Sequence, residues 1–376
     1  MNSRIIFVDG ISGAGKGTQI PFIERYLQGK GYDVLTVREP SSFLDGISRE
    51  YKRREDRSGM VATLLFAADR LHQYEHTIVP FLADHPQGIV LSDRSKLSSV
   101  VYQAEQGVPV EDIVHINRFY PDADLSLLLL CEPDIAIARI DRRGERSVDE
   151  ELVKIRRLKQ RYEALARNTG QRIVRSDGDP EAIQAQLRSH LNTFLGVPQE
   201  KVVFLDKDGT LVDNSGYPGI IPTDAIYYEH TVNGLRALQE GGYKLILISS
   251  QPWVARGRMT ADEVEATFQS VTRKYADVGI TIEGYKFCPH HRVEGGCRCK
   301  KPNTLLLEQI ADTMDVDIAN SFFVGDMGID IDCGRNFGLR TVLVETSSAA
   351  DRELGSEPTH RCADVNAAAE WILSKA

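Results

Sequence analysis

The sequence predicts two α/β domains in succession, each built on a doubly wound parallel sheet. Short β-rich runs alternate with helical stretches along all 376 residues, a pattern typical of repeated βα units. A chain of this length is too long for one ordinary core, so two domains are expected. Each half also begins with an apolar run that leads into a loop of the kind that binds phosphate.

The predicted strands form two groups separated by residues 196–200. This segment, Gly-Val-Pro-Gln-Glu, breaks the alternation, and a new apolar run follows it. We therefore predict domains at 1–196 and 201–376. The first has expected strands at 5–8, 34–37, 89–91, 125–130 and 172–175, and the second at 202–205, 244–248, 285–287, 321–324 and 341–344.

Composition argues against several classes of protein. Hydrophobic residues make up 42% of the chain and charged residues 26%, as in soluble globular proteins. The first residues lack a signal-peptide layout, and the densest apolar run, 125–130, has the length of a strand rather than of a membrane span. We expect a cytoplasmic protein with no membrane partner. The formal net charge of -9 argues against a dedicated nucleic-acid binder.

A glycine-rich loop follows the first predicted strand. Residues 10–18 read Gly-Ile-Ser-Gly-Ala-Gly-Lys-Gly-Thr, a P-loop pattern between a strand and a helix. Glycines let backbone N–H groups wrap a phosphate chain, and Lys16 can bridge its β- and γ-phosphates. Gly17 stands where Ser or Thr would ligate Mg²⁺, so we expect water and carboxylates such as Asp93 to place that metal. The pattern favours ATP binding over a chance glycine-rich turn, with candidate residues Gly10, Gly13, Gly15, Lys16, Gly17 and Thr18.

Residues 4–195 resemble the thymidylate kinase family in four motifs that keep the family's order and spacing. The motifs are Arg38-Glu39-Pro40, the acceptor helix 64–70, Asp93-Arg94 with 98–103, and Pro121-Asp122 with the strand and helix through Arg139. The resemblance implies a P-loop kinase fold and a (deoxy)nucleoside monophosphate as phosphoryl acceptor. The sequence departs from the family at Ser12, at 41–43 and at Ser95, which leaves thymidylate itself open as the acceptor.

The same resemblance implies roles for the acceptor-side residues. Phe66 would stack on the base, Arg70 would donate to its exocyclic oxygen, and Tyr102 would crowd the sugar 2′ position. Arg38 and Arg94 would clamp the acceptor phosphate, because guanidinium matches phosphate in bidentate fashion. Ser99 lies in the same segment as Tyr102 and is a further candidate. For Phe66, a core aromatic on an amphipathic helix remains the alternative.

An arginine run marks the expected lid. It could neutralise the transferring phosphoryl group, a step in which Lys16 and Arg94 would be the catalytic residues. A solvated helix face is the alternative for each arginine of the run. Its members are Arg139, Arg142, Arg143 and Arg146.

Two carboxylates follow the first strand of the second half. In Asp206-Lys207-Asp208-Gly209-Thr210, Asp206 can attack phosphorus while Asp208 protonates the leaving oxygen. This arrangement resembles the haloacid-dehalogenase-like phosphatases, which have a Rossmann-like fold. The resemblance implies that Ser249 holds the phosphoryl oxygens and that Lys301 is a compensating cation. Asp326 would bind Mg²⁺ together with Asp206 and the carbonyl of Asp208. A calcium-type loop is the alternative.

Three cysteines and a histidine lie close together in the sequence. Cys288, His290, Cys297 and Cys299 form the ligand set of a closed structural Zn²⁺ site. Unmetallated, reduced cysteines are the alternative.

These four residues, named the zinc clip, make the resemblance more specific. With them, residues 201–376 resemble the heptose bisphosphate and histidinol phosphate phosphatase family. Arg256 and Lys300 would then face the substrate. The sequence departs from that family at Ser250, Pro252-Trp253, Lys300 and Met327, so neither a heptose nor a histidinol substrate follows.

The two halves together predict a bifunctional enzyme acting on small-molecule substrates. One half would phosphorylate a nucleoside monophosphate with ATP, and the other would hydrolyse a phosphomonoester with Mg²⁺. A polynucleotide 5′-kinase/3′-phosphatase is the first alternative, although the net charge of -9 speaks against it. A second alternative is that one half is a non-catalytic regulatory module. We also expect a homodimer formed through the kinase half.

Overall fold

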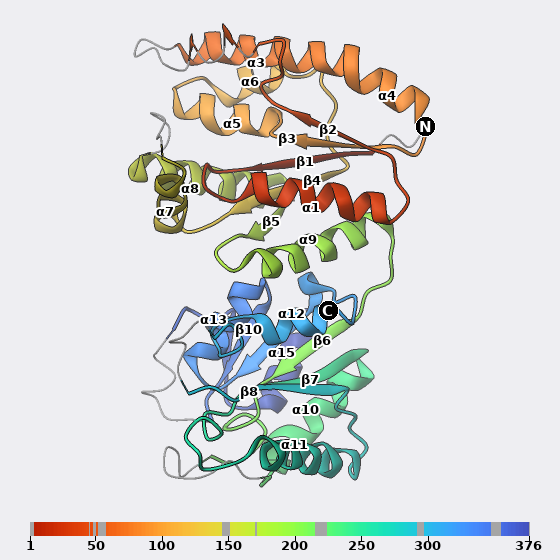
Figure 1. Ribbon diagram of the computed structural model, residues 1–376, viewed down its shortest axis with the longest axis vertical. Helices are drawn as coiled ribbons and strands as arrows, with labels where there is room; N and C mark the ends of the chain where they lie inside the picture. Colours follow the sequence, from red (N-terminus) through yellow and green to blue (C-terminus); the bar gives the residue numbers. More distant parts are fainter. Residues whose placement is uncertain are drawn as a thin grey trace. The chain divides into compact units, whose positions relative to one another are not determined.

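The computed structural model divides into two compact units, Met1–Pro180 and Glu181–Ala376. It describes residues 4–44, 46–47, 50–51, 58–144, 151–169, 171–214, 224–291, 297–346 and 355–375. Figure 1 shows the alternation of strands and helices along the chain in each unit. Of the arginine run, Arg146 lies outside the described residues.

The first unit is built on a five-stranded sheet of order β2-β3-β1-β4-β5. All pairings in it are parallel, which requires a crossover between successive strands. The strands are β1 (Arg4–Gly10), β2 (Val34–Arg38), β3 (Ile89–Asp93), β4 (Leu125–Leu130) and β5 (Arg172–Arg175). The helices are α1 (Lys16–Gly29), α3 (Gly59–Gln73), α4 (Val79–Asp84), α5 (Lys96–Glu105), α6 (Val110–Ile116), α7 (Pro133–Arg143) and α8 (Leu152–Thr169), with a π-helix, η1 (Tyr74–Ile78), between α3 and α4.

The second unit has a six-stranded parallel sheet of order β11-β10-β9-β6-β7-β8. Its strands are β6 (Lys201–Leu205), β7 (Tyr243–Ser250), β8 (Gly284–Cys288), β9 (Phe322–Gly325), β10 (Arg340–Val344) and β11 (His360–Cys362). Its helices are α9 (Pro180–Leu195), α10 (Tyr228–Glu240), α11 (Ala261–Ala276), α12 (Leu305–Ala311), α13 (Gly328–Phe337) and α15 (Val365–Leu373), and a 3-10 turn, η2 (Ile318–Asn320), precedes β9.

Alternate residues of β6 face two separate apolar cores. Val203 and Leu205 pack with residues of α10, α11 and α15. Val202 and Phe204 pack with residues of α9, α12 and α13. Because successive side chains of a strand point to opposite faces, this division places helices on both sides of the sheet. The prediction of two parallel-sheet α/β domains is confirmed.

Two local features concern the predicted boundary and the predicted strands. Helix α9 precedes the predicted boundary at 196–200, and its Ala182 and Ala185 pack in the core of the second unit, which begins at Glu181. The short strand β11 was not expected, because His-Arg-Cys has no apolar alternation, and only pairing with β10 extends it.

Candidate active sites

Glycine geometry shapes the loop after β1. Gly10, Gly13 and Gly15 have φ of 142°, 80° and 87°. A Cβ at Gly10 would lie 2.0 Å from the Leu129 carbonyl oxygen, so no other residue fits there. Gly17 and Thr18 form the first turn of α1, where backbone N–H groups point toward the loop. The loop therefore has the form of an anion cradle at a helix N-terminus.

Lys16 is held inside this cradle. Its Nζ donates to the carbonyl oxygens of Gly10 at 2.8 Å and Ile11 at 3.0 Å, and the side chain is buried. Burial lowers the pKa of Lys16 to about 7, and the nearby charge of Arg94 adds to the shift. An anion bound in the loop would relieve both effects.

Arg94 has the strained backbone of this half. Its φ of 77° is the one left-handed value recorded for a non-glycine residue in the described part of the chain. The guanidinium carbon lies 5.5 Å from the centre of the Tyr102 ring. Such strain persists only where the surroundings hold it, often at binding sites. The second expected clamp, Arg38, is 79% exposed and lies 3.8 Å from Asp93.

Arg70 makes more hydrogen bonds within the protein than the sequence motifs suggest. It is fully buried, and Glu39 accepts hydrogen bonds of 2.8 Å from Nε and 2.6 Å from Nη2. Ser99 accepts at 3.2 Å, and Asn117 accepts from Nη1. One N–H of Nη1 is left beyond these bonds, so only that group could serve the predicted contact with a base. The sequence motifs did not point to Asn117.

Phe66 and the lid arginines separate into different environments. Phe66 is half-buried on α3 and is not part of the buried core. Arg139 donates to the carbonyl oxygens of Ser176 at 2.8 Å and Gly13 at 3.4 Å, so it ties the cradle to the chain after β5. Arg142 is exposed at the end of α7.

The sequence motifs also did not point to Asp9, whose carboxylate is buried. It accepts hydrogen bonds from the hydroxyls of Ser95 at 2.6 Å and Ser98 at 2.5 Å. These bonds fix the start of α5, the helix that carries Ser99 and Tyr102. The signal in the sequence was an acidic residue near the end of an apolar strand, where burial needs polar partners.

In the second unit, Asp206 follows β6 and faces a lysine. Lys301 donates from Nζ to Asp206 Oδ1 at 2.5 Å and lies 2.5 Å from Asp330 Oδ1. Burial raises the pKa of Asp206, and the charge of Lys301 opposes that rise. Although burial alone would lower it, the two carboxylates raise the pKa of Lys301. The pair therefore places an ammonium beside a carboxylate, a group that can act as a nucleophile.

The carboxylates of Asp206, Asp326 and Asp330 could hold a metal ion. Each offers an oxygen, and these atoms lie within 4.8 Å of one another. Burial and the charges of Asp206 and Asp330 raise the pKa of Asp326 well above its usual range. Since Lys301 offsets only part of this negative charge, a hard divalent cation fits the cluster. Asp330 also accepts from the backbone N–H of Met327 at 3.1 Å, so it is placed to orient Lys301.

Gly209 makes room for this cluster. It has φ of 91°, and a Cβ there would lie 2.3 Å from Asp326 Oδ2. Thr210 donates to Asp326 Oδ1 at 3.0 Å. Asp208 stands between Lys207, which donates to Oδ1, and Gln251, which donates to Oδ2 at 2.6 Å. Burial raises the pKa of Asp208, in the direction that an acid needs. Ser249 is buried at the end of β7.

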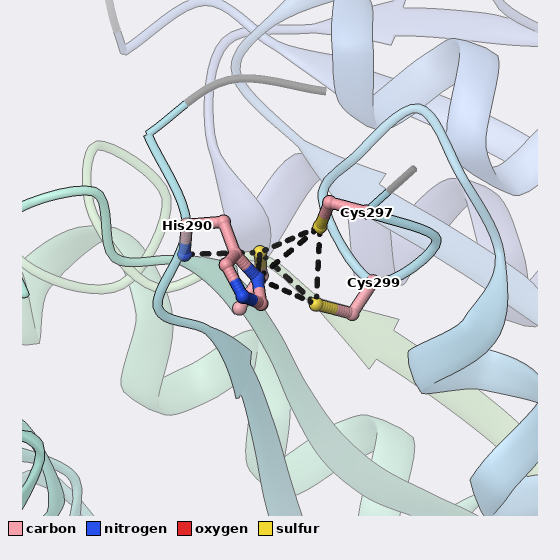
Figure 2. Close-up of side chains that lie close together, drawn as sticks. His290, Cys297 and Cys299 are labelled. Atoms are coloured by element: carbon pink, nitrogen blue, oxygen red, sulfur yellow. Dashed lines mark hydrogen bonds between the residues drawn. The ribbon is translucent and has the colours of Figure 1, made fainter. Parts of the chain in front are cut away.

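The four predicted zinc ligands converge. Figure 2 shows the side chains of His290, Cys297 and Cys299 pointing toward one another. Together with Cys288, their ligand atoms are 3.2 to 3.7 Å apart, with His290 using Nδ1. A tetrahedral zinc with bonds of about 2.0–2.3 Å needs ligand separations of roughly 3.3–3.8 Å. The donor set and its spacing fit Zn²⁺.

The two residues predicted to face the substrate in this half, Arg256 and Lys300, come before and after the clip ligands in the sequence. Arg256 Nη2 is 2.5 Å from His291 Nε2, and the guanidinium carbon is 5.0 Å from the Trp253 ring centre. Burial lowers the pKa of Lys300.

Within the described ranges, no helix has the length and apolar character needed to cross a membrane.

Comparisons with known proteins match the two halves separately. The thymidylate kinase family model matches residues 8–187, and a HAD-hydrolase-like model matches 298–368. A probable thymidylate kinase of Pyrobaculum aerophilum is 35% identical over 186 residues, 48% of this chain and 93% of that protein. A D-glycero-beta-D-manno-heptose-1,7-bisphosphate 7-phosphatase of Haemophilus ducreyi is 34% identical over 165 residues, 41% of this chain and 88% of that protein. A probable D-glycero-D-manno-heptose-1,7-bisphosphate 7-phosphatase of Thermoplasma acidophilum is 33% identical over 140 residues, 37% of this chain and 86% of that protein.

Proposed function

Because the chain belongs to the thymidylate kinase family in its first half and to the HAD-like phosphatases in its second, we propose two specific reactions for this kinase–phosphatase fusion. The first half transfers a phosphoryl group from ATP to a (deoxy)nucleoside monophosphate. The second hydrolyses a phosphomonoester through an aspartyl-phosphate. The observation that carries the proposal is the buried Asp206–Lys301 pair beside Asp326, which combines a nucleophile, a cation and a metal ligand.

In the kinase half, catalysis rests on holding two phosphate groups in line. The N–H groups of the 10–18 loop and Lys16 bind the ATP phosphates. Arg94, with Arg38, binds the acceptor phosphate, and Phe66 and Tyr102 bind its nucleoside. Mg²⁺, when bound with ATP, supplies further charge neutralisation, and Asp93 at the end of β3 is the nearby carboxylate expected to orient its water.

In the phosphatase half, Asp206 attacks phosphorus and the ester P–O bond breaks. Asp208 gives its proton to the leaving oxygen and then takes one from the water that hydrolyses the aspartyl-phosphate. Ser249 and Lys301 hold the phosphoryl oxygens. Asp206, Asp326 and the carbonyl of Asp208 would hold Mg²⁺, which offsets the charge of the phosphate when it is bound.

The zinc clip is proposed to be structural. Cys288, His290, Cys297 and Cys299 supply a full tetrahedral set, so no position is open for a reacting group. Arg256 and Lys300 are proposed to bind a polar or anionic part of the substrate.

A homodimer through the first half is part of the proposal. Exposed apolar side chains gather on two helices that pack against each other, α3 and α6. They are Met60, Val61 and Leu64 on α3, and Val110 and Val114 on α6. Light scattering of the purified chain should give twice the mass of 42.0 kDa, and a monomer at micromolar concentration would contradict this part.

A paired substrate screen tests the two reactions. ATP consumption is measured with each nucleoside monophosphate, deoxynucleotides included, and with 5′-hydroxyl oligonucleotides. Phosphate release is measured with sugar phosphates, nucleotides and 3′-phosphorylated oligonucleotides. Turnover of monomeric substrates in both arms supports the proposal. Turnover confined to oligonucleotide ends would instead indicate a polynucleotide 5′-kinase/3′-phosphatase. Inactivity of one half would favour the alternative that this half is a regulatory module.

A further inference from the structure

Gln251 connects three parts of the phosphatase site. It directly follows β7, and its side chain is fully buried. Its Nε2 donates to Asp208 Oδ2 at 2.6 Å and to Ser249 Oγ at 3.0 Å. Its backbone N–H donates to the carbonyl oxygen of Cys288 at 2.7 Å. One residue therefore contacts the acid, the phosphoryl-binding hydroxyl and the clip.

The amide completes a grip on both oxygens of the Asp208 carboxyl. Lys207, also fully buried, donates to Oδ1, and its Nζ lies 5.5 Å from the centre of the Phe268 ring. An ammonium is a point charge that tolerates many angles, whereas an amide N–H is directional. The orientation of the carboxyl thus depends on Gln251 more than on Lys207.

The other end of the Gln251 amide argues against a role in packing alone. Its Oε1 is buried and accepts no hydrogen bond from any residue that the structure describes. A buried carbonyl without a donor is costly, and an apolar side chain of the same length would avoid that cost. The contacts that offset the cost are those made by Nε2.

We propose that Gln251 is a positioning residue that aims the Asp208 carboxyl at the leaving oxygen. The inference rests on the proposed phosphatase reaction. In that step Asp206 forms the bond to phosphorus, the ester P–O bond breaks, and the Asp208 proton moves to the departing oxygen. Water then cleaves the aspartyl-phosphate and returns a proton to Asp208. The link to the Cys288 carbonyl fixes the backbone from which Gln251 reaches the acid.

Gln251→Met in the full chain tests this role, because methionine keeps the length and removes the donor. Substrates are a series of aryl phosphates with leaving groups of falling acidity, followed by alkyl phosphates. We expect kcat for alkyl phosphates to fall about 10- to 100-fold, a part of the general-acid contribution of roughly 10²–10⁴. For the most activated aryl phosphate we expect a change of less than about threefold, since that group leaves without a proton. KM should stay within about twofold throughout.

Two further variants complete the experiment, one as a control and one as a second test. Gln186→Met removes another buried glutamine, on α9, and should match the wild type for every substrate. Gln251→Glu keeps the polar shape but cannot donate when ionised, so it should reproduce the leaving-group dependence even if the methionine variant fails to fold. Zinc content, measured by elemental analysis, should equal that of the wild type in each variant.

The outcomes separate this inference from the proposed reaction. A wild-type chain that releases phosphate from no substrate overturns the reaction itself. A wild type that is active, with Gln251 variants that lose all substrates equally or lose zinc, shows a structural role and overturns the inference. A loss that grows as the leaving group becomes poorer supports it.

Discussion

The two halves place phosphate chemistry at the carboxyl ends of parallel strands, but they balance charge in opposite directions. In the first half, the phosphate loop holds a buried cation, Lys16, whose pKa is lowered to about 7 by burial and by Arg94. In the second, the site holds several buried carboxylates, and the pKa of Asp326 among them is raised by burial and by Asp206 and Asp330. An anion bound in the loop would therefore offset the buried positive charge at the first site, and a divalent cation would offset the charge of the carboxylates at the second.

The sharpest test of this comparison is whether the halves can be silenced separately. Asp206→Asn removes the nucleophile and should lower phosphatase turnover on the order of 10³-fold or more, with kinase turnover unchanged. Lys16→Ala should do the reverse, because the ATP phosphates lose their buried cation. Both activities are measured on each variant.

Matched controls are available in each half. Lys30→Ala at the end of α1 and Asp312→Asn at the end of α12 change exposed residues of the same types and should alter neither activity. Full phosphatase activity in Asp206→Asn, or a phosphoryl label on Ser249, would end the aspartyl-phosphate mechanism.

Removal of a clip ligand is the next largest expected effect. Cys297→Ser should abolish the binding of about one zinc per chain and destabilise the second half by several kcal/mol, roughly 5 °C or more in its melting temperature. Elemental analysis and calorimetry measure the two effects. Cys362→Ser changes a cysteine outside the cluster and should retain the metal. Zinc-free wild type, purified from zinc-supplemented cells, would contradict the assignment.

The buried ion pair of Arg70 and Glu39 allows charge pairing in the first half to be tested as well. Arg70→Met leaves the Glu39 carboxylate buried without its cation and should cost about 3–5 kcal/mol of unfolding free energy in that half. Adding Glu39→Gln should recover much of the loss, because no buried charge then remains unpaired. Urea unfolding measures all three proteins. If the double variant is as unstable as the single one, packing rather than charge pairing explains the loss.

The smallest expected effect is the uptake of a proton when ATP binds. Since the pKa of Lys16 is lowered from 10.5 to about 7, the free site lacks a proton between these pH values that the unfolded chain holds. Stability from this group therefore rises with pH across that window. Bound phosphates raise the pKa again, so ATP binding near pH 8.5 should take up roughly 0.5 to 1 proton.

Calorimetry in two buffers of different ionisation enthalpy measures this uptake. Lys16→Arg is the control, because arginine stays protonated throughout and should show none. Equal uptake by the wild type and this variant would mean that another group titrates.

Sequence reasoning predicted site residues where they stand in contiguous motifs. The P-loop, Asp206 with Asp208, and the clip are readable because one strand end or loop supplies most of each. Asn117 and Gln251 were missed for a physical reason. Asn117 is 47 residues from its partner Arg70, and Gln251 is 43 from Asp208, so only the folded sheet brings each pair together.

The position of α9 matters for anyone who divides this gene. The thymidylate kinase family model extends to residue 187, yet Ala182 and Ala185 of this helix cover the second sheet beside Val202 and Phe204. A fragment beginning at residue 201 would leave that apolar surface bare and prone to aggregate. We therefore expect that a separable phosphatase fragment has to begin ahead of α9, near residue 180.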